Sequence, residues 1–327
     1  MSLRCEYRQE SVAEVLRSDR VLGVVSFLPG QYCGDDPRVA STSLIRIDDE
    51  YCCEAWLSDT PVEYGVDEST GLGWSCNEEI LWVSVKMSET PGTDMTELSY
   101  QAYSRLLDFI SSRGYPNVVR AWNYFKDINK GEGDEERYKQ FCLGRHNALI
   151  EHEYLDRYFP AASALGCHEG ELIVYMIASK EKSVQVENAR QVSAYHYPRQ
   201  YGLRAPSFAR AAYKSWARSA DMYISGTASI VGYESQHQGD VLAQLALTLE
   251  NISALVDQVN EIDPMEKIDA RFGLDLLKVY IRHQADYPLI RKKLEEQYGH
   301  IPALYLQADV CRQELDVEIE GVGSIHL

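Results

Sequence analysis

The sequence contains no apolar run long enough to cross a membrane. Its longest apolar stretches, residues 21–28 and 172–178, fall far short of the roughly 18 residues that a membrane-spanning helix needs. The N-terminal residues are polar and charged, and they lack the apolar core of a signal peptide. We therefore expect a cytoplasmic protein without a membrane partner.

Clustered metal or redox ligands are also lacking. The eight cysteines are scattered, and none has the two-residue spacing of zinc knuckles or redox motifs. The eight histidines are equally dispersed, whereas a catalytic zinc needs ligands at helical or turn spacing. The sequence predicts reduced, mostly buried thiols and no metal, and no set of residues indicates an organic cofactor.

Basic residues are scarce, with 32 Lys and Arg against 50 Asp and Glu, which gives a net charge of −18. Nucleic acids and anionic membrane surfaces would be repelled, so neither is an expected partner. One segment reverses the balance, because no carboxylate lies between Glu187 and Asp221. Its bases and rings are Arg190, Arg199, Arg204, Arg210, Lys214, Arg218, Tyr195, Tyr197, Tyr201 and Phe208. It is either a solvated basic loop or a pocket for a small anion, and the rings favour the pocket.

The chain is long enough for two domains, and hydrophobic periodicity indicates an internal repeat at a spacing of about 140 residues. The first half predicts strands 80–87, 118–125, 172–178 and 184–192 with helices 94–112 and 134–150. The second half predicts strands 222–231, 274–281, 303–311 and 315–322 with a helix capped by Asp240 and another at 286–298. We expect an α+β fold of two homologous domains, residues 1–192 and 193–327. Residues 1–75 are expected to be strands and loops that complete the first domain.

Residues 225–259 resemble the signature of the RidA/YjgF family, in which a strand ending in Ser-Gly leads to Gly-Asp and a helix carrying Gln and Leu-Glu-Asn. The matching residues are Ser225, Gly226, Gly239, Asp240, Gln244, Leu249, Glu250 and Asn251. The sequence VEIEG at 317–321 resembles the last strand of that fold. This resemblance implies, for each domain, a mixed sheet with two helices on one face.

Three further segments, YPRQYGLRAPSFARA at 197–211, RYKQFCLGRHNAL at 137–149 and ALYLQADVCRQELDVEIEG at 303–321, resemble chorismatases. Together with the chain length, they extend the resemblance over most of residues 80–322. The resemblance implies that the substrate is chorismate and that its enolpyruvyl side chain leaves as pyruvate.

Cleavage of chorismate, a small dianion with an enol ether, needs cationic clamps for two carboxylates and an acid that is undissociated near neutral pH. Glu318 is the candidate acid, because alternation along the strand places it on one face with Asp316 and Glu320, whose charges hinder its ionisation. The alternative is an exposed acidic strand face. Aligning 317–321 with 184–188 pairs Glu318 with Gln185, so only the second domain has an acid there. The resemblance implies that Glu318 is the proton donor and that Glu320 is structural.

For the clamps we select Arg210, Arg291, Arg204 and Arg145, with Tyr201 as a hydroxyl donor. Arg210 follows the Pro-aromatic-Ala pattern that brings a loop into the ligand pocket of RidA proteins. Arg291 could equally be a surface arginine, and Arg145 could pair with a nearby carboxylate.

Two positions are implied by the resemblance to choose the product. Ala228 favours a dihydrodiol carboxylate, whereas Cys311 favours 3-hydroxybenzoate. We expect 3-hydroxybenzoate, since a cysteine beside the ring changes its chemistry more than one methyl group does. Cys311 could instead be a small buried apolar residue.

Two other functions remain open at this stage, an enamine or imine deaminase and a non-catalytic module that binds small anions. RidA deaminases bind the substrate carboxylate with an arginine on the penultimate strand, where this chain has Tyr305, and this difference argues against imine hydrolysis. RidA proteins are trimers with sites between subunits, so either a monomer or a homotrimer is expected here.

Overall fold

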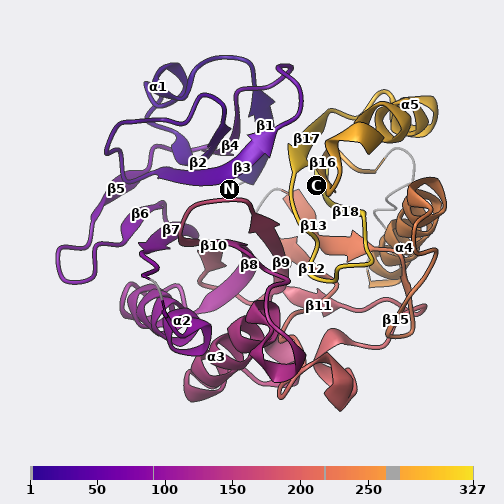
Figure 1. The fold of residues 1–327 in the computed structure, drawn as a ribbon. Coiled ribbons are helices and arrows are strands. Elements are labelled where there is room, and N and C mark those ends of the chain that lie inside the picture. Colours follow the sequence, from indigo (N-terminus) through magenta and orange to yellow (C-terminus); the bar gives the residue numbers. More distant parts are fainter. Residues whose placement is uncertain (1–2, 91, 217–218, 263–272, 327) are drawn as a thin grey trace.

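The computed structural model describes residues 3–90, 92–216, 219–262 and 273–326 (Figure 1). The N-terminal segment, residues 3–58, contains β1 (Leu3–Arg8), α1 (Val12–Val15), β2 (Val21–Leu28), β3 (Val39–Arg46) and β4 (Cys53–Ser58). The first repeat contains β5 (Glu63–Val66), β6 (Gly73–Cys76), β7 (Ile80–Met87), α2 (Met95–Ser112), β8 (Asn117–Lys126), α3 (Arg137–Glu151), β9 (Ala161–Cys167) and β10 (Leu172–Ser179). The second repeat contains β11 (Val184–Val186), β12 (Ala211–Ser215), β13 (Ser219–Ala228), α4 (Val241–Ile262), β16 (Leu276–Ile281), α5 (Tyr287–Tyr298), β17 (Ala303–Gln307) and β18 (Val317–His326), with a small hairpin of β14 (Ile230–Val231) and β15 (Glu234–Ser235) after β13.

The two repeats have the same topology. The sheet of the first repeat has the order β5-β6-β7-β10-β8-β9. The strands of the second repeat have the equivalent order β11-β12-β13-β18-β16-β17, and they form one end of a larger, ten-stranded sheet. In each repeat the last two strands in this order are parallel, and the other pairs are antiparallel. The predicted α+β class and the internal duplication are both confirmed.

Each pair of helices covers one face of its sheet. Helix α2 buries Leu98, Ala102, Leu106 and Ile110 at a spacing of four residues, and its first turn is capped by Asp94. Helix α4 likewise buries apolar side chains every three or four residues, and the Asp240 carboxylate accepts the backbone N–H of Ala243 at 3.0 Å, as predicted. The helices therefore form the two outer layers of the molecule (Figure 1).

The other faces of the two sheets pack against each other and form a single aromatic core. Within it, Trp122 stacks on Tyr175 with ring centroids 4.8 Å apart, and Trp82 stacks on the same tyrosine at 4.9 Å. Strand alternation explains this layer, because successive side chains of each strand face either the helices or the opposite sheet. Any group that projects from β18 toward the first repeat is thus held between two rigid sheets.

The sheets divide the chain differently from the predicted boundary at residue 192. The first sheet ends at Ser179, and β11 at Val184 already belongs to the second repeat. The strands of residues 3–58 do not complete the first domain, because β3 pairs with β17 and joins them to the second repeat in one ten-stranded sheet. Only β5 and β6 complete the first sheet.

Most predicted elements are present, with changed ends. The strand β9 was not predicted, since its sequence AASALGC lacks the branched and aromatic residues typical of strands. The predicted strand 184–192 stops at Val186, and the predicted strand 303–311 stops at Gln307. Within the described residues, no helix is long and apolar enough to span a membrane.

Candidate active site

A cavity of about 250 Å³ lies between the two repeats, on the face of β18 that points away from α4 and α5. Its walls come from the start of α3, the segment 197–210, the end of β13 and the loop 311–315. The lining residues are Glu136, Tyr138, Lys139, Tyr197, Gln200, Tyr201, Pro206, Phe208, Arg210, Gly226, Ala228, Ile230, Cys311, Arg312, Gln313, Glu314, Leu315 and Glu318. A single chain therefore provides both sides of this cavity.

Strand alternation places Glu318 in this cavity. Its neighbours Val317 and Ile319 point into the core under α4 and α5, so Glu318 and Glu320 point toward the first repeat. Each is only 5% exposed, which excludes the alternative of a solvated acidic face. Gly226 lies against the Glu318 carboxyl, and a Cβ at this glycine would collide with Oε1. A larger residue here would have to displace the carboxyl group from this position.

The surroundings of Glu318 keep its carboxyl group protonated at neutral pH. Burial is the main cause, and the negative charge of Glu320 adds to it. Arg120, Arg210 and Arg282 act in the opposite direction without cancelling these effects, and the pKa of Glu318 is raised to about 8.

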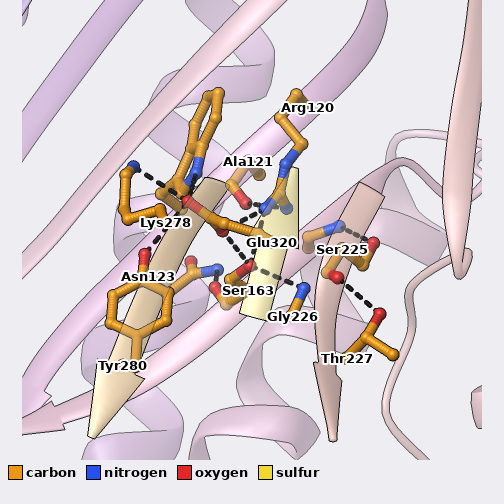
Figure 2. A network of polar contacts seen from close by, with 12 residues as sticks. Arg120, Ala121, Asn123, Ser163, Ser225, Gly226, Thr227, Lys278, Tyr280 and Glu320 are labelled. Carbon is orange, nitrogen blue, oxygen red and sulfur yellow. Dashed lines mark hydrogen bonds and ion pairs between the residues drawn. The ribbon is translucent and has the colours of Figure 1, made fainter. Parts of the chain in front are cut away.

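Glu320, two residues further along the strand, has the opposite character (Figure 2). Its carboxylate pairs with Arg120 at 2.5 Å and Lys278 at 2.8 Å. It also accepts hydrogen bonds from Ser163 at 2.5 Å, Trp122 Nε1 at 2.9 Å and Tyr280 at 3.0 Å. Burial alone would raise the pKa of Glu320, but Lys278 and Arg120 lower it to about 2. Two neighbouring carboxyl groups are thus held in different protonation states, a pattern typical of acid-base sites.

Arg210 lies at the cavity wall immediately before β12 and is 4% exposed. Its Nη2 donates to the Tyr197 hydroxyl at 2.6 Å and to the Val192 carbonyl at 3.0 Å. Its Nε has no hydrogen-bond partner within the described residues, and no described carboxylate forms an ion pair with this guanidinium. A buried cation without an anion is costly, so the site is suited to an anionic ligand.

The other predicted residues at this cavity are Tyr201, Ala228 and Cys311. Ala228 lies opposite Glu318 in the pairing of β13 with β18, and it packs in one cluster with Cys311. Burial, and secondarily the Glu318 carboxyl, raises the pKa of the Cys311 thiol to about 12. Cys311 is therefore a neutral group, unsuited to act as a thiolate nucleophile.

Arg291 and Arg204 do not lie at the cavity. Arg291 is on α5, which covers the opposite face of the sheet, and it pairs there with Glu295 at 2.7 Å and with Asp48 and Glu50 at 3.5 Å. Arg204 is exposed on its loop. The expectation that these two arginines hold the ligand is corrected by this placement: periodicity could not show which face of the sheet carries the site.

Arg145 lies behind the cavity wall and is 2% exposed. The predicted alternative of a carboxylate partner is wrong for the described residues, because its neighbours are rings. Its guanidinium is 5.2 Å from the Phe141 ring and 6.0 Å from the Tyr103 ring, and its Nε and Nη2 lack hydrogen-bond partners in the described part of the chain. Arg145 is thus a second buried guanidinium, besides Arg210, that forms no ion pair with a described carboxylate.

Arg312 was missed by sequence reasoning, although it directly follows Cys311. Its guanidinium lies 4.1 Å from the centre of the Tyr201 ring, and its Nη1 donates to the Tyr233 carbonyl at 2.9 Å and to Ser235 Oγ at 3.0 Å. It lines the cavity together with Arg210, and its partners Tyr201, Tyr233 and Ser235 are distant from it in sequence. Only its place beside Cys311 could have indicated it.

The residues of the RidA-like signature position the walls of the cavity. Gln244 on α4 donates to the Glu314 carbonyl at 3.0 Å and accepts the Asp316 N–H at 2.8 Å. Asn251, two turns further, donates to the carbonyls of Ala228 and Ile230. One helix thus fixes both the loop before Glu318 and the end of β13.

The sheet order corrects the alignment of the repeats. Strand β11, with Gln185, begins the second repeat, so β10 is the counterpart of β18. Glu318 pairs with Tyr280, and in the first repeat Ile173 pairs in the same way with Tyr124. In this alignment too, only the second repeat has an acid at the position of Glu318, because the first repeat has Ile173 there.

Comparison with known proteins finds relatives along the whole chain. Residues 54–178 match the family described as "Chorismatase FkbO/Hyg5-like, N-terminal". A 3-hydroxybenzoate synthase from Streptomyces hygroscopicus is 37% identical over 280 residues, which cover 82% of this chain and 80% of the relative. A chorismatase from Streptomyces rapamycinicus is 32% identical over 328 residues, which cover 97% of each chain. The crystal structure of a chorismatase, 28% identical, superposes with a TM-score of 0.89 over 98% of each chain.

Proposed function

The chain belongs to the chorismatase family, an enzyme family that acts on chorismate, and we propose that Glu318 starts the cleavage by protonating the enolpyruvyl group. The observation that carries this proposal is a buried carboxyl group, protonated at neutral pH, in a small cavity that also contains an arginine without a carboxylate partner. Protonation of carbon is slow, so it needs an acid held at the methylene group and not lost to solvent.

The two buried guanidiniums suit the two carboxylates of chorismate. Arg210 binds one carboxylate at the cavity wall, and Tyr201 contributes a hydroxyl group there. Arg145 does not line the cavity but lies near Tyr138, which does, and from there it supports the second carboxylate. A substrate anion would relieve the cost of two positive charges that the folded chain leaves without carboxylate partners.

Proton transfer from Glu318 to the methylene carbon turns the enol ether into an oxocarbenium ion. The new Glu318 carboxylate then lies beside this cation and stabilises it. In one route, pyruvate leaves with one of the two ring oxygens as its keto oxygen, the ring aromatises to 3-hydroxybenzoate, and the ring proton returns to Glu318. In the other route, water adds to the cation and a dihydrodiol carboxylate is released with pyruvate.

We favour 3-hydroxybenzoate as the product. A neutral, water-excluding thiol at Cys311 suits a route that consumes no water. A 3-hydroxybenzoate synthase among the relatives supports the same choice. Ala228 lies on the strand beside the acid and restricts the position of the ring.

The direct test is incubation of the purified protein with chorismate alone, with identification of products by mass spectrometry. We expect pyruvate and 3-hydroxybenzoate in equal amounts, and we expect Glu318→Gln to reduce turnover by roughly a hundredfold or more while chorismate still binds. Glu296→Gln, a matched change at an exposed position on α5, is expected to retain full activity. A dihydrodiol product would overturn the choice of route, and the absence of pyruvate would overturn the proposed function.

A further inference from the structure

The N-terminal segment contributes no residue to the cavity lining, yet it places one carboxylate in the ion-pair network of Glu320, the neighbour of the acid on β18. Glu54 on β4 is 1% exposed and pairs with Lys278 Nζ at 2.6 Å. Its other oxygen accepts the indole N–H of Trp56 at 2.8 Å. Lys278 simultaneously pairs with Glu320 at 2.8 Å, so it connects the N-terminal segment to the strand that carries Glu318.

This contact depends on curvature of the large sheet. Strands β4 and β16 are separated by β2, β3 and β17, which in a flat sheet would place them roughly 19 Å apart. The sheet instead curls around the aromatic core, so Glu54 and Lys278 meet across its inner face. The hydroxyl of Tyr7 on β1, which donates to the Leu277 carbonyl at 2.9 Å, fixes the same approach.

Glu54, Lys278, Glu320 and Arg120 form a closed set of buried charges, which we call the charge quartet. Each member is at most 5% exposed, and the two positive charges balance the two negative ones. Ser163 extends the quartet toward the acid, because its Oγ donates to Glu320 and accepts the N–H of Gly226, the residue that lies against the Glu318 carboxyl (Figure 2).

Resting on the proposed role of Glu318, we propose that Glu54 is a positioning residue that balances the charge quartet and so keeps the cavity acid in its protonated form. Without Glu54, the quartet would carry one net positive charge next to Glu318, which favours the carboxylate over the acid. The quartet is expensive as a purely structural device, since apolar side chains of similar volume stabilise a core at least as well. A role in setting the local field explains why four charges are buried here.

Other charged and titratable groups also face Glu318, and the test must hold them constant. They lie on the first repeat, the segment 197–210, the end of β16 and the loop before β18. They are Arg120, Glu136, Tyr138, Lys139, Tyr197, Tyr201, Arg210, Arg282, Cys311, Arg312, Glu314 and Glu320. The substitution Glu54→Gln replaces none of these residues.

The experiment follows the protonated carboxyl band of Glu318 by infrared spectroscopy while the free protein is titrated, with Glu318→Gln identifying the band by its loss. Glu54→Gln is expected to lower the midpoint by about half a pH unit or more, since it removes a charge that opposes ionisation. The double variant Glu54→Gln with Lys278→Met removes one charge of each sign, and we expect its midpoint to return to that of the unchanged protein. Glu10→Gln removes the same charge from an exposed place on the same segment and should leave the midpoint unchanged.

Either of two results would overturn the proposal: a midpoint that Glu54→Gln leaves unchanged, or a midpoint that shifts as far in the double variant as in the single one. The second result would indicate a loss of packing, because removal of a second side chain does not restore packing. If Glu54→Gln does not fold, the comparison of Lys278→Met alone with the double variant isolates Glu54. Lys278→Met is expected to raise the midpoint, and the added Glu54→Gln is expected to lower it again. No substrate is used, so failure here leaves chorismate cleavage standing. Conversely, the variants could show the expected shifts while the unchanged protein releases no pyruvate from chorismate. That result would contradict only the proposed function.

Discussion

At the scale of single residues, the chemistry of the site depends on the different environments of Glu318 and Glu320. Both are carboxyl groups on one face of β18, but only Glu320 has two cations and three hydrogen-bond donors. Glu318 has the bare backbone of Gly226 against it and forms no ion pair within the described part of the chain. The same residue type therefore provides an anion at one position and a protonated carboxyl group at the other.

This difference predicts the pH dependence of turnover. Since Glu318 must be protonated and its pKa is raised to about 8, the rate is expected to be constant near neutral pH and to fall as pH rises through about 8. Values of kcat/KM for pyruvate release between pH 4 and 10, which report groups of the free enzyme, measure this directly. A rate that falls through the ordinary glutamate range near pH 4.5 instead would assign the proton to another group.

The same pKa predicts the effect of Glu318→Gln on stability. The folded protein keeps a proton on Glu318 that the unfolded chain loses above its ordinary pKa of 4.5, so stability falls as pH rises from 4.5 to about 8. The glutamine variant lacks this loss and should gain stability relative to the unchanged protein across that range, on the order of a few kcal/mol at pH 8. Urea unfolding at pH 5 and pH 8 tests this, and an equal difference at both values would be inconsistent with it.

At the scale of elements, helix α4 connects the signature residues to the cavity. Gln244 holds the loop before β18 and Asn251 holds the end of β13, both through hydrogen bonds to the backbone. These signature residues thus position two segments of the cavity wall, whereas Glu318 itself lies on β18.

Gln244→Ala is expected to loosen the loop 311–316 and to lower stability by about 1–3 kcal/mol, because it leaves buried backbone groups without partners. Hydrogen exchange should accelerate in this loop and remain unchanged in α2 and α3. Gln258→Ala on the same helix, whose side chain donates to the exposed Glu261, is the control and should leave exchange in the loop as it was.

At the scale of the whole molecule, three parts of the chain share one core. Trp56 of the N-terminal segment lies 5.4 Å from Trp122 of the first repeat and 6.0 Å from Tyr223 of the second, measured between ring centroids. Neither repeat has a separate inner core, and residues 3–58 cover part of the aromatic layer. The predicted monomer or homotrimer stays a prediction, but both walls of the cavity belong to one chain.

This shared core predicts a single cooperative unfolding transition, although the chain contains two repeats. Tryptophan fluorescence, which reports the layer between the sheets, and far-UV circular dichroism, which is dominated by the outer helices, should give the same urea midpoint. Trp56→Ala should lower that midpoint equally for both signals, and it should reduce the free energy of unfolding by about 3–5 kcal/mol. Two separated transitions would show that the repeats unfold independently.

The sequence alone determined the fold class, the duplication and the family, because these depend on local periodicity and on spaced motifs. Strand alternation also selected Glu318 as the candidate acid, whose role stays a proposal. It also indicated Arg210, Tyr201, Ala228 and Cys311 at the cavity. Tertiary structure alone decided that Arg291 faces away, since a helix pattern does not show which side of its sheet carries the site. It likewise decided that residues 3–58 join the second repeat and that Glu54 meets Lys278, because curvature of a ten-stranded sheet joins residues that have no local relation.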